Sequence, residues 1–163
     1  MPTVSNTSPI SNPASIGQLD LLKLQFPVVL IPDTVAAELA AHPDPLARAL
    51  IQAAIDDWWI RIAAVADSRL LRILLWQLHR GEAEAIALAA DLNARVVLID
   101  EQEGRMLAAK AGLAVTGVLG LLLRAKRLGY IAALKPAIDL LRTKAGFFVA
   151  PSLEARVVAA AGE

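Results

Sequence analysis

The distribution of apolar and polar residues along the chain predicts short buried strands separated by helices. The run Arg95–Ile99 is continuously apolar after its first residue, which is typical of a strand buried on both faces of a parallel sheet. Comparable runs predict further strands at Thr3–Ser5, Val28–Ile31 and Trp59–Val65. Two weaker segments are candidates for additional strands: Ala114–Thr116, between Gly112 and Gly117, and Phe147–Val149, after Gly146.

Between these strands, apolar residues recur with a helical period, and prolines, glycines and capping residues mark the helix ends. The stretch Ile16–Leu24 carries its apolar residues on roughly one side and is predicted to be the first helix. A second helix begins after Pro32, where Asp33 or Thr34 can cap it. Further helices are predicted at Leu46–Ile55, Leu70–Leu78, Gly81–Leu92, Glu103–Ala111, Gly117–Leu128, Pro136–Lys144 and Leu153–Ala160.

This alternation of strands and helices predicts a three-layer α/β/α sandwich with a mainly parallel sheet, formed by residues 1–163 as a single domain. A chain of 163 residues can bury a sufficient core without disulfides or a structural metal. In such sheets, ligands bind at the carboxyl ends of the strands. Functional residues are therefore expected where the predicted strands end.

Composition and charge narrow the classes of function. The formal net charge is zero, so any contact with nucleic acid needs a local basic patch rather than a basic protein. The chain has no cysteine, which excludes a disulfide framework and zinc sites built on thiolates. It shows neither a signal peptide nor an apolar run long enough to span a bilayer, so we expect a cytoplasmic protein that does not enter a membrane.

Acidic residues lie at several of the predicted strand ends. Asp100 and Glu101 follow the most apolar strand, Glu38 lies on the first turns of the helix after the second strand, and Glu82 and Glu84 begin a later helix. Each acid alone has a simpler explanation, because helix N-termini favour carboxylates and an aspartate can cap the following helix. As a set they would repel one another and need a counter-charge. Mg²⁺ or Mn²⁺, which prefer oxygen ligands, would supply it and would support hydrolysis of a phosphodiester.

Five segments, in order along the chain, resemble those of the PIN domain, and more narrowly the VapC-related branch of single-domain prokaryotic proteins. They are SNTSPI, IPDTVAAEL, GEAEAIALA, LIDEQEGR and VTGVLGLLLRAKRLGYI, and the resemblance extends from Thr3 to about Val149. It implies a metal-dependent ribonuclease with a four-acid centre that uses Mg²⁺ or Mn²⁺. Proteins of this branch are often the toxin of a toxin–antitoxin pair and often homodimers, so the implied partners are RNA, an antitoxin protein and a second copy.

Carried over residue by residue, the resemblance implies that Glu38 supplies the second acid and Asp100 the fourth. The third is Glu82 or Glu84, with Glu82 favoured because it stands nearer the strand-end side of its helix. Glu101, next to Asp100, could substitute for it or assist it, and both Glu84 and Glu101 are candidates for additional ligands.

The first position of the four-acid motif departs from the family pattern. Family members generally have an aspartate there, and this chain has Asn6, followed by the small hydroxyl residues Thr7 and Ser8. Asn6 keeps a carbonyl oxygen able to bind a metal but lacks the negative charge, which predicts weaker metal affinity. Thr7 or Ser8 would position water or phosphate.

Two functions are therefore carried forward. The first is a metal-dependent RNA endonuclease, the toxin of a toxin–antitoxin pair. The alternative is a catalytically weak or inactive PIN-fold protein that binds RNA or a protein partner. A phosphatase-like domain is a third interpretation, against which the missing Asp-x-Asp pair after the first strand counts.

A basic cluster near the end of one predicted helix is the candidate RNA contact. It consists of Arg124, Lys126 and Arg127, with Lys23, Arg80 and Arg105 as further candidates. Cations at a helix C-terminus also complement the helix dipole, which is the simpler explanation for the cluster.

Overall fold

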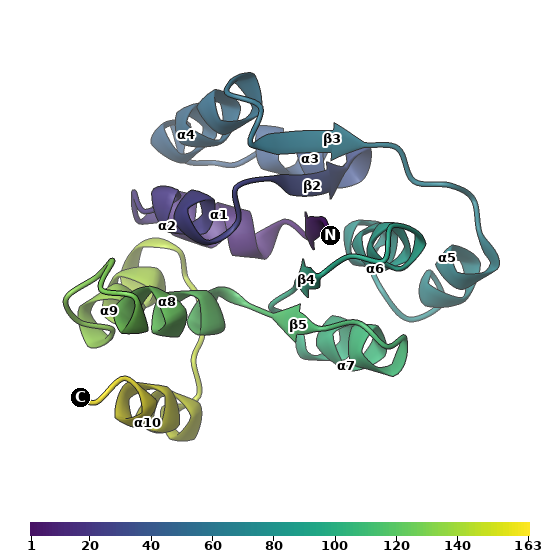
Figure 1. The fold of residues 1–163 in the computed structure, drawn as a ribbon. Helices are drawn as coiled ribbons and strands as arrows, with labels where there is room; N and C mark the ends of the chain where they lie inside the picture. Colours follow the sequence, from purple (N-terminus) through teal and green to yellow (C-terminus); the bar gives the residue numbers. More distant parts are fainter.

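The computed structural model, which describes residues 1–163, contains one five-stranded sheet in which all neighbouring strands are parallel (Figure 1). The spatial order is β3-β2-β1-β4-β5. The strands are β1 (Thr3–Ser5), β2 (Val29–Pro32), β3 (Ile60–Ala63), β4 (Val96–Leu98) and β5 (Val115–Thr116). The predicted three-layer α/β/α architecture with a parallel sheet is confirmed.

Strand β1 lies at the centre of the sheet, between β2 and β4, and this position determines what lies beyond its end. Ser5 is in register with Leu98, the last residue of β4. The backbone N–H of Asn6 then donates to the Leu98 carbonyl at 3.0 Å. The segments that follow β1 and β4 therefore leave the sheet side by side.

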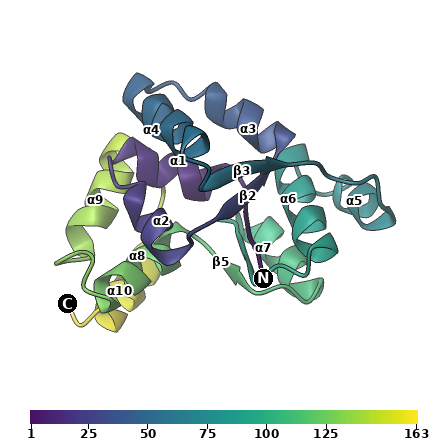
Figure 2. The ribbon, with the colours of Figure 1, turned by 45° about the horizontal axis from the view of Figure 1, so that its top comes forward.

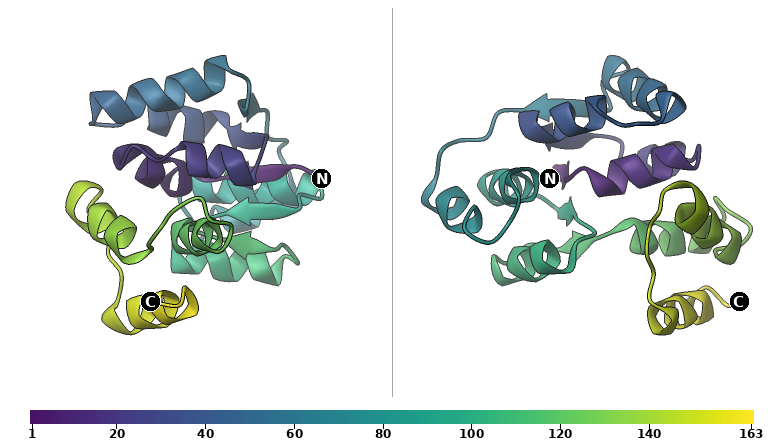
Figure 3. Two further views of the ribbon diagram at one scale, coloured as in Figure 1. Left: turned by 60° about the vertical axis from the view of Figure 1, so that its left-hand side comes forward. Right: turned by 180° about the vertical axis from the view of Figure 1, so that it is seen from behind.

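Helices cover both faces of the sheet, with α1, α2, α4, α8 and α9 on one side and α5, α6 and α7 on the other (Figures 1 and 2). The helices are α1 (Ser8–Ser15), α2 (Asp20–Gln25), α3 (Asp33–Ala40), α4 (Pro45–Asp56), α5 (Arg69–Leu74), α6 (Arg80–Asp91), α7 (Gln102–Lys110), α8 (Val118–Arg127), α9 (Lys135–Lys144) and α10 (Pro151–Ala160). Helix α10 packs against α8 and lies away from the sheet in both views of Figure 3. None of these helices has the length and apolar character needed to cross a bilayer.

Two hydrophobic cores lie on the opposite faces of the sheet. Val97 and Leu98 are adjacent on β4, yet Val97 packs into the core beneath α6 whereas Leu98 packs into the larger core on the other face. Both side chains are fully buried. The continuous apolar run predicted to be a strand buried on both faces is therefore confirmed.

The predicted first helix, Ile16–Leu24, is wrong in its bounds. Helix α1 instead occupies residues 8–15, the chain turns at Gly17 with φ +69°, and α2 begins at Asp20. Two prolines make residues 8–15 resemble a break in the sequence. Pro9 stands in the first turn of α1, where its missing N–H would have no helical partner, so only Pro13 removes a backbone hydrogen bond.

Of the two weaker strand candidates, only the first forms a strand. Val115–Thr116 pairs with β4 as edge strand β5. Phe147–Val149 instead belongs to the connection between α9 and α10. Gly146, with φ +64°, ends α9, and the N–H of Phe147 turns back to the Leu141 carbonyl at 3.1 Å instead of joining the sheet.

Candidate functional site

The candidate site lies at the carboxyl ends of β1 and β4, where two short connections lead into helices. Asn6 and Thr7 alone separate β1 from α1, so the polar group Asn6-Thr7-Ser8 is fixed at the sheet edge. Glu101 immediately precedes α7, which follows β4. Glu38 comes from the middle of α3, and Glu82 comes from the first turn of α6.

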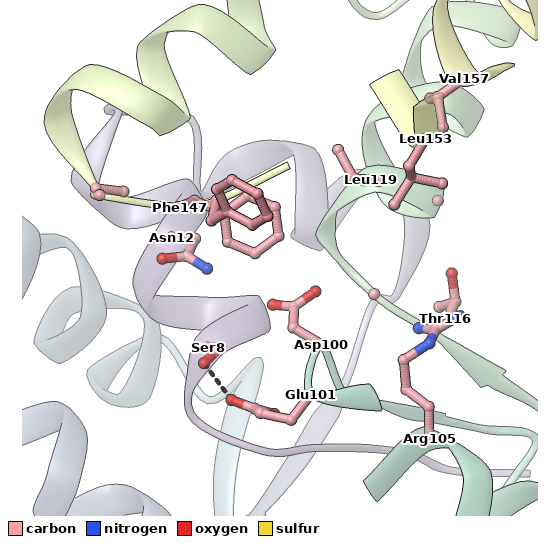
Figure 4. A pocket seen from close by; sticks show the side chains of 15 residues that line it. Ser8, Asn12, Asp100, Glu101, Arg105, Thr116, Leu119, Phe147, Leu153 and Val157 are labelled. Carbon is pink, nitrogen blue, oxygen red and sulfur yellow. Dashed lines mark hydrogen bonds between the residues drawn. The ribbon is translucent and has the colours of Figure 1, made fainter. Parts of the chain in front are cut away.

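Hydrogen bonds join the residues after β1 to two of these acids. Asn6 Nδ2 donates to Glu101 Oε2 at 3.2 Å. Ser8 Oγ donates to Glu101 Oε1 at 2.9 Å (Figure 4). Thr7 Oγ1 donates to Glu38 Oε2. The predicted small hydroxyl residues therefore orient carboxylates in this structure.

The N-terminus of α6 comes very close to this group because residue 81 is glycine. A Cβ atom at Gly81 would lie 2.9 Å from Glu38 Oε1 and 3.3 Å from Asn6 Oδ1. The absence of that atom lets α6 bring Glu82 to the same edge. Burial raises the pKa of Glu82 above its ordinary value, and the negative charge of Glu101 is the next largest cause in the same direction.

Glu84 lies two residues further along α6 and has a different environment. Its carboxylate accepts a hydrogen bond from the Arg80 guanidinium at 2.8 Å. Residues two apart on a helix do not face the same way. The structure therefore gives Glu84 a cationic partner of its own, while Glu82 faces the other acids.

Asp100 is directed away from Asn6 and toward the start of α8. Its Oδ1 accepts from the backbone N–H of Val118 at 2.7 Å, and a Cβ atom on Gly117 would lie only 2.5 Å from that oxygen. Oδ2 is buried without a hydrogen-bond partner. Burial raises the pKa of Asp100 to about 6, against the opposing effect of the Val118 amide.

Of the two adjacent acids after β4, the structure thus joins Glu101 to Asn6 and Ser8, and Asp100 to α8. The sequence left open whether Asp100 caps a helix; it does so for α8 rather than for the helix that follows it directly.

The group formed by Asn6, Glu38, Glu82 and Glu101, which we call the acid cluster, has the donor chemistry of a site for a hard cation. It offers three carboxylates and one amide carbonyl, all oxygen ligands, with no thiolate or imidazole among them. No three acidic side chains in the structure already stand in an arrangement that could hold a metal. By ligand type, the residues fit Mg²⁺ or Mn²⁺.

The predicted basic cluster lies at the far end of α8 from this site. Asp100 contacts the N-terminus of α8, whereas Arg124, Lys126 and Arg127 occupy its last turn, about 10 Å along the helix axis. Lys126 Nζ donates to the Ala132 carbonyl at 2.5 Å.

Another predicted cation lies at the site itself. Arg105 donates to the Ile99 carbonyl at 2.9 Å, beside Asp100 (Figure 4).

A cavity of about 640 Å³ opens beside the acid cluster and is lined by Glu101 of the cluster and by Ser8, which donates to Glu101. Asn12 and the pair Phe147–Phe148 also line this cavity, and sequence reasoning did not assign them to a site. Asn12 was missed because α1 was not predicted. The two phenylalanines were missed because their segment was assigned to a strand.

Comparison with known proteins agrees with this architecture. The family model described as a PIN domain matches residues 2–163. Among solved structures, the chain is similar to a PilT N-terminus domain protein from the hyperthermophilic archaeon Sulfolobus solfataricus P2. The two sequences are 20% identical, and the structures superpose with a TM-score of 0.56 over 77% of this chain and 93% of the other. This similarity is one of fold. No curated protein matches the sequence. Because the family model spans almost every residue, the chain belongs to the PIN-domain family.

Proposed function

We propose that this protein is a metal-dependent RNA endonuclease that acts as the toxin of a toxin–antitoxin pair. PIN domains are generally nucleases and typically use divalent metal ions. The observation that carries the proposal is the convergence of Asn6, Glu38, Glu82 and Glu101 at the carboxyl ends of β1 and β4. Glu101 takes the fourth position of the acid centre in this proposal, ahead of Asp100, because Glu101 contacts Asn6 and Ser8.

The acid cluster would hold Mg²⁺ or Mn²⁺, which would activate a water molecule and offset the charge of the phosphodiester. Two hydroxyl residues would orient the carboxylates that bind the metal. Thr7 holds the Glu38 carboxylate and Ser8 holds the Glu101 carboxylate, each through a donated hydrogen bond. Such contacts fix the direction in which a ligand oxygen points, which is worth about 10- to 100-fold in metal affinity or activity.

The raised pKa of Glu82 has a direct consequence for this site. A carboxyl group that is buried among other acids keeps its proton to higher pH than an isolated glutamate. Binding a cation at the cluster requires that proton to leave. Metal affinity is therefore expected to increase as the pH rises, with release of a proton from Glu82.

The test is incubation of the purified protein with a labelled RNA pool in Mg²⁺, in Mn²⁺ and in EDTA. Cleavage confined to the metal lanes, and lost in Glu82→Gln, supports the proposal. Glu84→Gln is the matched control, because it changes the same residue type on the same helix turn but at a carboxylate already paired with Arg80. Cleavage that persists in EDTA, or that survives Glu82→Gln, would contradict it.

One observation favours the alternative of a PIN-fold protein that binds RNA or a protein partner without efficient cleavage. The Asn6 amide donates to Glu101, so an uncharged group and a hydrogen bond stand where the family pattern has its first carboxylate. If RNA binds in the presence of Mn²⁺ but is not cut, and Asn6→Asp creates metal-dependent cleavage, the alternative is correct.

The proposed toxin role requires an RNA target in the cytoplasm, a cognate antitoxin and, as in related toxins, a homodimer. Ile73 at the end of α5 and Trp76 just after it leave apolar side chains exposed, 49% and 85% respectively, as partner surfaces do. Induced expression in bacteria should arrest growth in the natural chain but not in Glu82→Gln. Equal growth of the two strains would remove the toxin role while leaving the nuclease activity to the RNA assay.

A further inference from the structure

The cavity beside the acid cluster has two chemically different ends (Figure 4). One end is apolar, with Phe147, Phe148, Leu119 and Leu153 contributed by α8, α10 and the α9–α10 connection. The other end is polar and contains Asp100, with Asn12 on one side and Arg105 on the other. A volume of about 640 Å³ is in the range of sites that take a ligand of nucleotide size.

Two glycines of the cavity wall allow other wall residues to pack closely against the backbone. A Cβ atom on Gly117 would collide with Asp100 Oδ1, and one on Gly120 would collide with Thr116. These contacts fix the positions of Asp100 and Thr116 in the wall between β5 and the first turn of α8.

Phe148 supplies the second observation. Its side chain is 82% exposed at the cavity, whereas Val149, the next residue, is buried in the core. The adjacent Phe147 is half-buried and lines the same cavity as Asn12 and Asp100 (Figure 4). An exposed ring of this kind offers a free π-face without any packing role in the chain itself.

Charge decides which part of a nucleic acid would enter. Asp100 and Glu101 line the cavity with only Arg105 to oppose them, so its polar end does not favour a phosphate group. A nucleobase is uncharged, stacks on aromatic side chains and offers N–H groups to a carboxylate or an amide. Ser8 and Glu101 border both this cavity and the acid cluster, so a base held here would lie next to the proposed cleavage point.

We propose that this cavity binds one unpaired nucleobase of the RNA substrate, stacked on Phe148 and Phe147, with Asn12 and Asp100 facing the edge of the base. The inference rests on the proposed function for its position beside a scissile phosphate. The binding itself requires no cleavage and is tested without it.

The experiment measures binding of a short fluorescein-labelled single-stranded RNA by anisotropy, with Ca²⁺ in place of Mg²⁺. A series of analogues, each lacking one base, is compared with the intact RNA. In the natural chain, loss of the base at one position is expected to weaken binding at least about fivefold, because base stacking on an aromatic ring contributes about that much or more. With Phe148→Ala that position-specific effect disappears, and with Phe148→Tyr it returns.

The matched control is Trp58→Ala. Trp58 is also an exposed aromatic residue, at 71%, but it precedes β3 and so lies at the opposite edge of the sheet. This variant should retain the position-specific effect.

A flat profile across all positions, or a profile unchanged by Phe148→Ala, would overturn the base pocket. A flat profile in a protein that cuts RNA with Mn²⁺ refutes the pocket and leaves the nuclease proposal standing. A Phe148-dependent profile in a protein that cuts nothing supports the pocket and refutes the nuclease proposal.

Discussion

Replacing Asp100 by asparagine should make the metal-free protein more stable at neutral pH. In the folded chain the pKa of this carboxyl group is about 6, against an ordinary value of 3.8, because the group is buried. The folded state therefore holds a proton between these two pH values that the unfolded state has released. The free energy of unfolding consequently falls as the pH rises from about 4 to 6, and stays at its lower value above that window.

The size of this effect follows from the two pKa values. Each pH unit between them corresponds to about 1.4 kcal/mol, so ionised Asp100 lowers the free energy of unfolding by up to about 3 kcal/mol at pH 7.5. Asparagine cannot ionise, and its side-chain oxygen can still accept the hydrogen bond from the Val118 N–H. Asp100→Asn should therefore match the natural chain near pH 4 and exceed it in stability by up to about 3 kcal/mol at pH 7.5.

The assay is urea unfolding in EDTA, followed by circular dichroism at several pH values between 4 and 8. Asp67→Asn is a control with the opposite sign, because the pKa of exposed Asp67 is lowered by its hydrogen bond to Arg72. That variant should lose a little stability at neutral pH and none at acidic pH. If the curves of Asp100→Asn and the natural chain stay parallel from pH 4 to pH 8, the burial of an ionisable Asp100 is refuted.

Three further changes probe the same region. Glu101→Gln removes the carboxylate that contacts Asn6 and Ser8. It is expected to lower metal-dependent cleavage of labelled RNA at least about 100-fold. A loss of cleavage in Asp100→Asn but not in Glu101→Gln would mean that Asp100, and not Glu101, is the fourth acid. Asn6→Asp places two like charges where a 3.2 Å hydrogen bond now stands. The free energy of unfolding of the metal-free protein, measured in urea, should fall by about 1–3 kcal/mol, and calorimetry should show Mn²⁺ binding at least about tenfold tighter. Unchanged Mn²⁺ affinity would contradict this. Gly117→Ala forces a Cβ atom against Asp100 and should cost about 1–3 kcal/mol of stability, a cost that should shrink in the double variant with Asp100→Ala; simple additivity of the two changes would count against the contact.

Continuous apolar runs made the sheet predictable from the sequence. A strand such as β4 buries both faces, and its short run of β-branched and aliphatic residues predicts its ends within one residue. Helix α1 was not predictable in the same way, because Pro9 and Pro13 resemble breaks until the position of each in the helix is known. Phe147–Val149 has strand-like composition but finds no neighbouring strand, and only the tertiary structure decides that.

The sequence predicts the position of the candidate site better than the role of each residue in it. The strand-end rule pointed to the residues after β1 and β4, and the structure brings these residues into contact because parallel strands end at a common edge. It could not distinguish Asp100 from Glu101, because adjacent residues beyond a strand leave in different directions and sequence spacing does not fix which one turns inward. The partners Val118 and Ser8 make that distinction, and both lie far away in the sequence from the acids they contact.

Asn6 changes the balance between a stable empty site and a tightly bound cation. Burial raises the pKa of Glu82, and the negative charges of Glu101 and Glu38 raise it further. An aspartate at position 6 would add a fourth negative charge and could not donate to Glu101, so the empty site would depend more strongly on a cation. Asn6 instead donates to Glu101 and holds that carboxylate in place without one. The same hydrogen bond must be given up or rearranged before Glu101 and the Asn6 carbonyl can both turn toward a metal. Any cleavage by this chain should therefore need a higher Mn²⁺ concentration than cleavage by Asn6→Asp. The ratio of the two half-saturating Mn²⁺ concentrations measures how much free energy of metal binding is lost through that rearrangement and the missing charge.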